Sequence, residues 1–164
     1  MKKILLLIIL SLPALISEAQ GFKHAIGIRG GLSSGFEYRF YTDDSNSYKF
    51  LLSTRNQGVQ FHALREFHRF DLFDFSEQLV LVYGVGIHAG FESWDEVHYL
   101  NNTRWYDSRT ALLAGIDGLA GVEYVFYEVP VSIGLEVKPF FDVFGKNMFR
   151  VQPFDFAFTV KYLF

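Results

Sequence analysis

The sequence of 164 residues has no cysteine, only four prolines and only two tryptophans. Without cysteine it forms no disulfide framework, no thiolate nucleophile and no thiolate metal site, and its N-terminus cannot carry a cysteine-linked lipid. Disorder is excluded, because half of the residues are hydrophobic and 18% are aromatic. The formal net charge of −3 provides no basic surface, so we expect no nucleic-acid partner.

The N-terminus has the features of an export signal. Two lysines after Met1 precede an unbroken apolar run over residues 4–10, and Ala19 supplies the small residue that a leader peptidase requires. The whole apolar stretch is shorter than the roughly 20 residues that a membrane-spanning helix needs, which disfavours a permanent anchor. We predict a cleavable signal peptide at residues 1–19 and a single mature domain at residues 20–164.

Alternation of apolar and polar residues runs through the mature chain. Between residues 79 and 91 the odd positions are Leu, Leu, Tyr, Val, Ile, Ala and Phe, while the even positions from 84 onward are Gly, Gly, His and Gly. A period of two is typical of a β-strand and not of a helix. Eight segments follow this rule, so the sequence predicts strands at residues 23–32, 34–42, 47–55, 58–68, 79–92, 110–127, 129–139 and 152–164.

The number of strands predicts how they are arranged. Eight is an even number and most connections are short, so neighbouring strands are expected to run antiparallel, and closure of the sheet leaves no unpaired edge. The predicted fold class is therefore all-β: an eight-stranded antiparallel up-and-down β-barrel.

The volume of the apolar side chains indicates which face of the barrel is inside. An eight-stranded barrel has an interior just wide enough to be filled by side chains, and the apolar faces carry more Phe and Tyr rings than such a space can hold. We therefore predict a transmembrane β-barrel whose apolar face meets the hydrocarbon of a bilayer. A soluble exported barrel that carries a ligand is the alternative.

The opposite face carries glycines and charges of both signs, which are expected to pair in a narrow polar lumen. His62, Glu66 and His68 share this face of one strand and could bind a metal ion or relay protons, but a polar lumen produces the same spacing by default. We favour a structural network and assign no catalytic, metal-binding or cofactor-binding residue. The predicted network comprises Arg29, Glu37, Arg39, His62, Glu66, His88, Asp117, Glu123, Glu136, Lys138, Asp155 and Lys161.

Two stretches carry a family resemblance. One is the C-terminal Tyr162-Leu163-Phe164, and the other is GIDGLAGVEY at residues 115–124. They resemble the small eight-stranded outer-membrane β-barrel proteins, similar in architecture to the OmpA transmembrane domain and OmpX. The resemblance implies a location in the outer membrane, contact with its lipid, and recognition of Tyr162 and Phe164 by the barrel-assembly machinery. It implies little about activity.

Two longer connections, residues 93–109 and 140–151, are predicted to lie outside the cell. The first contains aromatic residues that suit the binding of an unidentified extracellular ligand, although tryptophan and tyrosine also settle at the headgroup level of a membrane. The candidate contacts are Trp94, Tyr99, Trp105 and Tyr106.

These features favour a structural or surface-interaction protein that acts through its external loops. A small-solute channel or porin-like protein is the first alternative, but side chains fill the centre of a barrel of this size. An outer-membrane lipid-modifying enzyme is the second, and it would need a serine and an acid beside His24 on the lipid-facing side. The pattern places neither there, so we predict that the protein is not an enzyme.

Overall fold

The computed structural model describes residues 22–55, 57–70, 72–73, 75–100, 103–145 and 149–164. The predicted signal peptide at residues 1–19 lies outside them. No helix among the described residues is long and apolar enough to cross a membrane. The strands are β1 (His24–Gly31), β2 (Ser34–Asp43), β3 (Asn46–Arg55), β4 (Gly58–Arg69), β5 (Leu79–Leu100), β6 (Thr103–Val125), β7 (Val131–Val137), β8 (Phe140–Phe144), β9 (Arg150–Gln152) and β10 (Phe156–Leu163).

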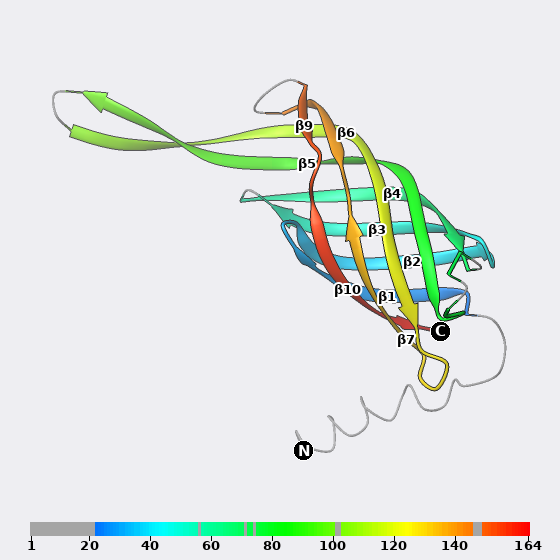
Figure 1. Cartoon of the computed structure of the whole chain (residues 1–164). Helices are drawn as coiled ribbons and strands as arrows, with labels where there is room; N and C mark the ends of the chain where they lie inside the picture. The colour runs from blue at the N-terminus through cyan, green and yellow to red at the C-terminus, as the bar shows by residue number, and fades with distance from the viewer. Residues whose placement is uncertain (1–21, 56, 71, 74, 101–102, 146–148) are drawn as a thin grey trace, which may run out of the picture.

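The strands form a closed antiparallel ring with eight positions (Figure 1). Each strand from β1 to β6 pairs with the next, and β1 also pairs with β10, which closes the ring through β7 and β6. Strands β7 and β8 occupy one position, because both pair with β6, and β9 pairs with β8 ahead of β10. The predicted eight-stranded up-and-down β-barrel is confirmed.

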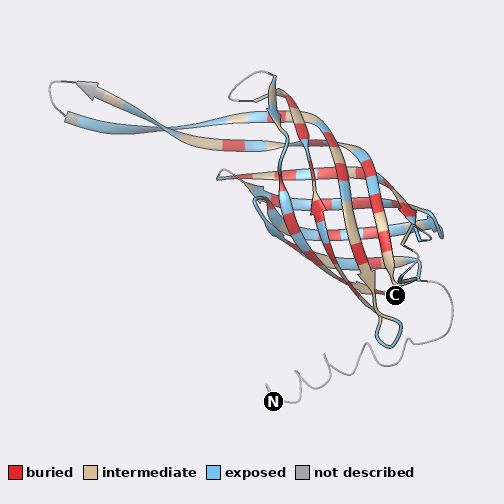
Figure 2. Cartoon of the chain, in the orientation of Figure 1, coloured by how far each residue is buried: buried red, intermediate tan, exposed pale blue. Residues whose placement is uncertain are grey.

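The register places all apolar faces on one side of the sheet. Between β1 and β10, for example, Ile28 is opposite Val160, whereas the neighbouring pair is Arg29 and Thr159. Figure 2 shows the result as buried and exposed residues that alternate along each strand. Phe36 is 72% exposed and Leu135 is 67% exposed. The bulky apolar residues therefore cover the outside of the barrel and the charged residues line its interior, as the volume argument predicts.

The prediction that residues 93–109 form a loop is wrong. Strands β5 and β6 continue through this region and pair as far as Leu100 and Thr103, so the segment is a two-stranded ribbon that extends beyond the barrel (Figure 1). It contains two Trp and two Tyr, which are residue types enriched in strands. The ribbon was missed because neither of its faces packs on a core, so apolar and polar residues do not alternate along it.

The prediction that residues 140–151 form a connection between strands is also wrong. They contain β8 and β9, which pair with each other. Pro139 has no backbone N–H to offer to the sheet, so the ladder on β6 is interrupted there and resumes in β8. The carbonyl of Pro139 accepts a hydrogen bond from the Gly118 amide at 2.7 Å, which keeps β7 and β8 aligned along β6. The last strand is likewise divided, because residues 153–155 lie between β9 and β10 as non-strand residues.

Two apolar residues on the polar side of β6 have a packing role. Leu119 lies in a small apolar cluster inside the barrel with Leu64, Val80 and Val82, and Val125 packs against that cluster. The interior therefore combines a small apolar cluster with a charged network.

Candidate functional site: the charged interior

The twelve residues predicted to form a polar network all point into the barrel and are buried, the most exposed being Glu136 at 8%. The structure adds charged residues that were not in the predicted set. Lys49 lies on the polar face of its strand and could have been included by the same rule. Glu92, at the end of the predicted strand 79–92 and on its polar face, could have been included in the same way. Asp142 and Arg150 could not, because they lie in residues 140–151, which were read as a connection. Arg55 also takes part in the interior ion pairs, with its Nη1 3.8 Å from Asp155 Oδ2.

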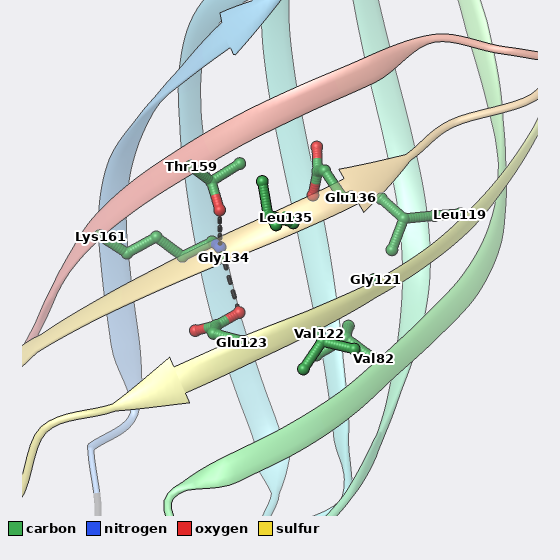
Figure 3. A pocket seen from close by; sticks show the side chains of 10 residues that line it. All are labelled: Val82, Leu119, Gly121, Val122, Glu123, Gly134, Leu135, Glu136, Thr159 and Lys161. Carbon is green, nitrogen blue, oxygen red and sulfur yellow. Dashed lines mark hydrogen bonds and ion pairs between the residues drawn. The ribbon is translucent and has the colours of Figure 1, made fainter.

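At the end of the barrel that holds the C-terminus, Arg39 connects two carboxylates. Its Nε lies 2.6 Å from Glu66 Oε2, and its Nη1 lies 2.9 Å from Glu123 Oε2. Lys161 is held between Glu123 Oε2 at 3.1 Å and Thr159 Oγ1 at 2.9 Å (Figure 3). A void of about 10 Å³ borders these groups, which is about enough for a single water molecule. Side chains therefore fill the interior at this level.

In the middle of the barrel, Lys49 is the cation that joins the surrounding carboxylates. Its Nζ lies 2.7 Å from Glu37 Oε2 and 2.7 Å from Glu136 Oε2. Glu136 in turn contacts Arg29, whose Nε lies 2.6 Å from Glu136 Oε1. Arg29 reaches Asp155 at 3.4 Å, which links the centre to the opposite end of the barrel.

Toward the opposite end, histidines and carboxylates from several strands meet. Nδ1 of His62 lies 2.8 Å from Asp117 Oδ2, and Nδ1 of His88 lies 3.1 Å from Asp117 Oδ1. Nε2 of His88 lies 2.8 Å from Asp142 Oδ1. The ammonium of Lys138 is 3.5 Å from Asp117 Oδ1.

The grouping of His62 with Glu66 and His68, considered from sequence spacing, is not the one that the structure brings together. Glu66 and His68 both contact Ser47, at 3.2 and 2.8 Å, near the other end of the barrel. His62 faces His88 from the adjacent strand.

The energetic character of this network follows from its burial. Taking charges out of water is costly, and their mutual attraction offsets that cost only when every charge is paired. Removing one member of a buried pair typically costs about 3–5 kcal/mol, because the remaining charge is stranded. The interior is thus suited to fixing the barrel in one arrangement.

The predicted surface contacts lie on the ribbon. Trp94 and Trp105 are on one face of it, where the Trp105 ring lies 5.4 Å from that of His98, and Tyr106 is on the other face. Tyr99 is in β5 near the tip. Arg109 and Glu96 form an exposed ion pair at 2.8 Å on the same face as Trp105.

The C-terminal residues are tied to the first strand. The Phe164 amide donates to the His24 carbonyl at 2.8 Å, and the Phe164 ring stacks on the His24 ring at 5.6 Å and on Tyr162 at 6.1 Å. His24 is on the outer surface, and its Nδ1 contacts the Tyr38 hydroxyl at 2.8 Å. Its neighbours there are aromatic rings, with Phe40 at 5.3 Å.

Comparison with known proteins identifies the fold. The sequence matches no model of a known protein family, and no curated protein matches it. Among solved structures, the N-terminal β-barrel domain of Pseudomonas aeruginosa OprF is similar, with a TM-score of 0.54 over 88% of this chain and 100% of that domain. The chain has the fold of the OprF barrel domain. Because only 12% of the residues are identical, the likeness to OprF is one of fold.

Proposed function

We propose that the chain is an outer-membrane β-barrel protein with a side-chain-filled polar lumen, which acts as a structural or surface-interaction protein. The observation that carries the proposal is the inverted polarity of the barrel: aromatic and aliphatic side chains cover its outside, and ion pairs fill its inside. Such a surface is unfavourable in water and favourable in hydrocarbon. The OprF-like fold supports the same location.

The interaction role is assigned to the ribbon of β5 and β6. With the C-terminus on the periplasmic side, the ribbon projects from the outer surface of the cell and exposes Trp105 and Tyr106. Exposed aromatic side chains on a projecting segment are typical of binding sites. We expect Trp105 and Tyr106 of the ribbon to contact an extracellular ligand.

Fractionation tests the location. The full chain is expressed with residues 1–19 in place, and inner and outer membranes are separated by density. We expect the protein in the outer membrane, extracted only by detergent, with a gel mobility that changes on boiling. Recovery in the aqueous fraction without detergent would contradict the proposal and favour the soluble carrier.

The assembly role of the C-terminus has a separate test. Phe164→Ala is expected to lower the amount of folded barrel in the membrane if the assembly machinery recognises this ring. Phe154→Ala is the matched control, because Phe154 is also an exposed ring near the start of the last strand. Equal yields for both variants would contradict recognition of Phe164.

Conductance and lipid analysis separate the two alternatives from this proposal. A continuous water path would have to pass Arg39, Lys49 and their carboxylates, so we expect no ion conductance in planar bilayers. We also expect no change in lipid composition when His24 is replaced by alanine. Steady single-channel currents would favour the channel, and a His24-dependent lipid product would favour the enzyme.

A further inference from the structure

Three metal-ligating side chains converge inside the barrel from three neighbouring strands. His62 on β4 is directly opposite His88 on β5, and Asp117 on β6 is opposite Gly86, two residues before His88. One ligand atom from each side chain lies within 4.8 Å of those of the other two, and all three residues are buried. In a tetrahedral zinc site neighbouring donors are about 3.3–3.5 Å apart, so after small rotations these side chains would supply three of the four donors and a water molecule the fourth.

The second nitrogen of each histidine is already held by another group. Nε2 of His62 is hydrogen-bonded to Ser53 Oγ at 3.0 Å, and Nε2 of His88 lies 2.8 Å from Asp142 Oδ1. In metal sites a ligating histidine usually donates its other N–H to a carboxylate or a similar acceptor, which fixes the ring and directs the free nitrogen to the metal. Both Nδ1 atoms here point to Asp117, so the arrangement matches that pattern.

A glycine makes room for this arrangement. A Cβ atom added to Gly115 on β6 would come within 2.6 Å of His88 Cε1. The imidazole of His88 therefore lies directly over the backbone of the neighbouring strand, and this placement directs it between Asp117 and Asp142.

The charge of the interior favours one additional cation. Among the described residues, the interior ion pairs join eight carboxylates to seven lysine and arginine side chains. With neutral imidazoles the interior is one positive charge short, which a second proton on His88, held between Asp117 and Asp142, or a metal ion in place of that proton would supply. The carboxylates are Glu37, Glu66, Glu92, Asp117, Glu123, Glu136, Asp142 and Asp155, and the cations are Arg29, Arg39, Lys49, Arg55, Lys138, Arg150 and Lys161.

We propose that His62, His88 and Asp117 bind one divalent transition-metal ion of the zinc class. Imidazole nitrogens with a carboxylate suit Zn²⁺ and Co²⁺ rather than Mg²⁺ or Ca²⁺, which prefer oxygen ligands. The ion would replace the direct contacts of the two Nδ1 atoms with Asp117. It would tie β4, β5 and β6 together within the barrel.

Lys138 sets how tightly the ion is held. Its Nζ lies 3.5 Å from His62 Nδ1, 3.5 Å from Asp117 Oδ1 and 3.5 Å from Asp155 Oδ2. A bound cation repels this ammonium and moves it toward Asp155. Removing the ammonium is therefore expected to strengthen metal binding.

Titration of the purified barrel tests the site. The protein is folded in detergent without a histidine tag, and Co²⁺ is added while the visible absorption is recorded; Zn²⁺ then competes. We expect one ion per chain, a loss of affinity of at least tenfold in His62→Gln, and a loss of about 10- to 100-fold in Ser53→Ala. Lys138→Met should bind more tightly than the unchanged protein.

His68→Gln is the matched control, because His68 is buried in the same interior but lies at the other end, against Ser47. It should bind Co²⁺ as the unchanged protein does, with each variant first shown to be folded by its gel mobility. The proposal is overturned if the unchanged protein binds no ion. It is also overturned if His68→Gln loses as much affinity as His62→Gln, or if Ser53→Ala and Lys138→Met both leave the affinity unaltered.

Discussion

Replacing Lys49 by methionine tests whether the interior ion network stabilises the barrel. The ammonium is fully buried and lies 2.7 Å from Glu37, 2.7 Å from Glu136 and 3.7 Å from Glu66. Methionine keeps most of the side-chain length but leaves these carboxylates without their shared cation. Breaking a buried ion pair from one side costs about 3–5 kcal/mol, which is a large part of a typical unfolding free energy of about 5–15 kcal/mol.

An exposed ion pair of similar length provides the control. Arg109 and Glu96 on the ribbon are 2.8 Å apart, but their side chains are 53% and 45% exposed. Exposed pairs contribute about 0–1 kcal/mol, so Arg109→Met should hardly change the free energy of unfolding. The double variant of Lys49→Met with Glu136→Gln should be more stable than Lys49→Met alone, because it removes the excess negative charge that Lys49→Met creates while Arg29 stays paired with Asp155.

Urea unfolding of the three variants in lipid vesicles, followed by gel mobility and tryptophan fluorescence, measures these differences. The reasoning is refuted if Lys49→Met costs no more than Arg109→Met. Such a result would mean that water enters the barrel and solvates the carboxylates.

Three further predictions follow from the fold. Leu135→Arg, in the middle of β7 on the outer surface, should lower the unfolding free energy in lipid by about 2–4 kcal/mol. Urea titration measures this loss, and an unchanged unfolding free energy would contradict the prediction. Gly115→Ala should destabilise the barrel because the added Cβ would collide with the Phe141 carbonyl oxygen and with His88 Cε1, whereas Gly30→Ala should not, because no atom lies within 4 Å of the added Cβ; equal melting temperatures would contradict this. Replacing residues 95–108 with Asn-Gly should leave the boiled and unboiled gel mobilities distinct, because the described residues of this segment pair only between β5 and β6.

The strands of the barrel could be predicted from sequence because each has one apolar and one polar face. That condition fails wherever both faces meet the same surroundings. The ribbon at residues 93–109 is such a case, and its two strands were read as a loop. Residues 140–151 failed for another reason, since the pairing with β6 is interrupted at Pro139 and resumes in β8.

The interior residues could also be predicted, because the position of a residue in the alternation fixes the side of the sheet. Their partners could not. His62 faces His88 and Asp117 only because of the register of β4, β5 and β6, and the alternation of apolar and polar residues fixes that register only to within steps of two residues. Asp142 reaches His88 only because β8 resumes on β6 after the interruption.

The most direct test of the central claim is to measure which side chains meet lipid. In a protein whose two tryptophans are replaced by phenylalanine, a single tryptophan is introduced by Phe158→Trp on the outer face of β10 or by Tyr106→Trp on the ribbon. The account predicts that brominated lipids strongly quench the fluorescence of Phe158→Trp and leave that of Tyr106→Trp largely unchanged. Equal quenching, or quenching of Tyr106→Trp alone, would contradict a barrel whose apolar exterior lies in the bilayer.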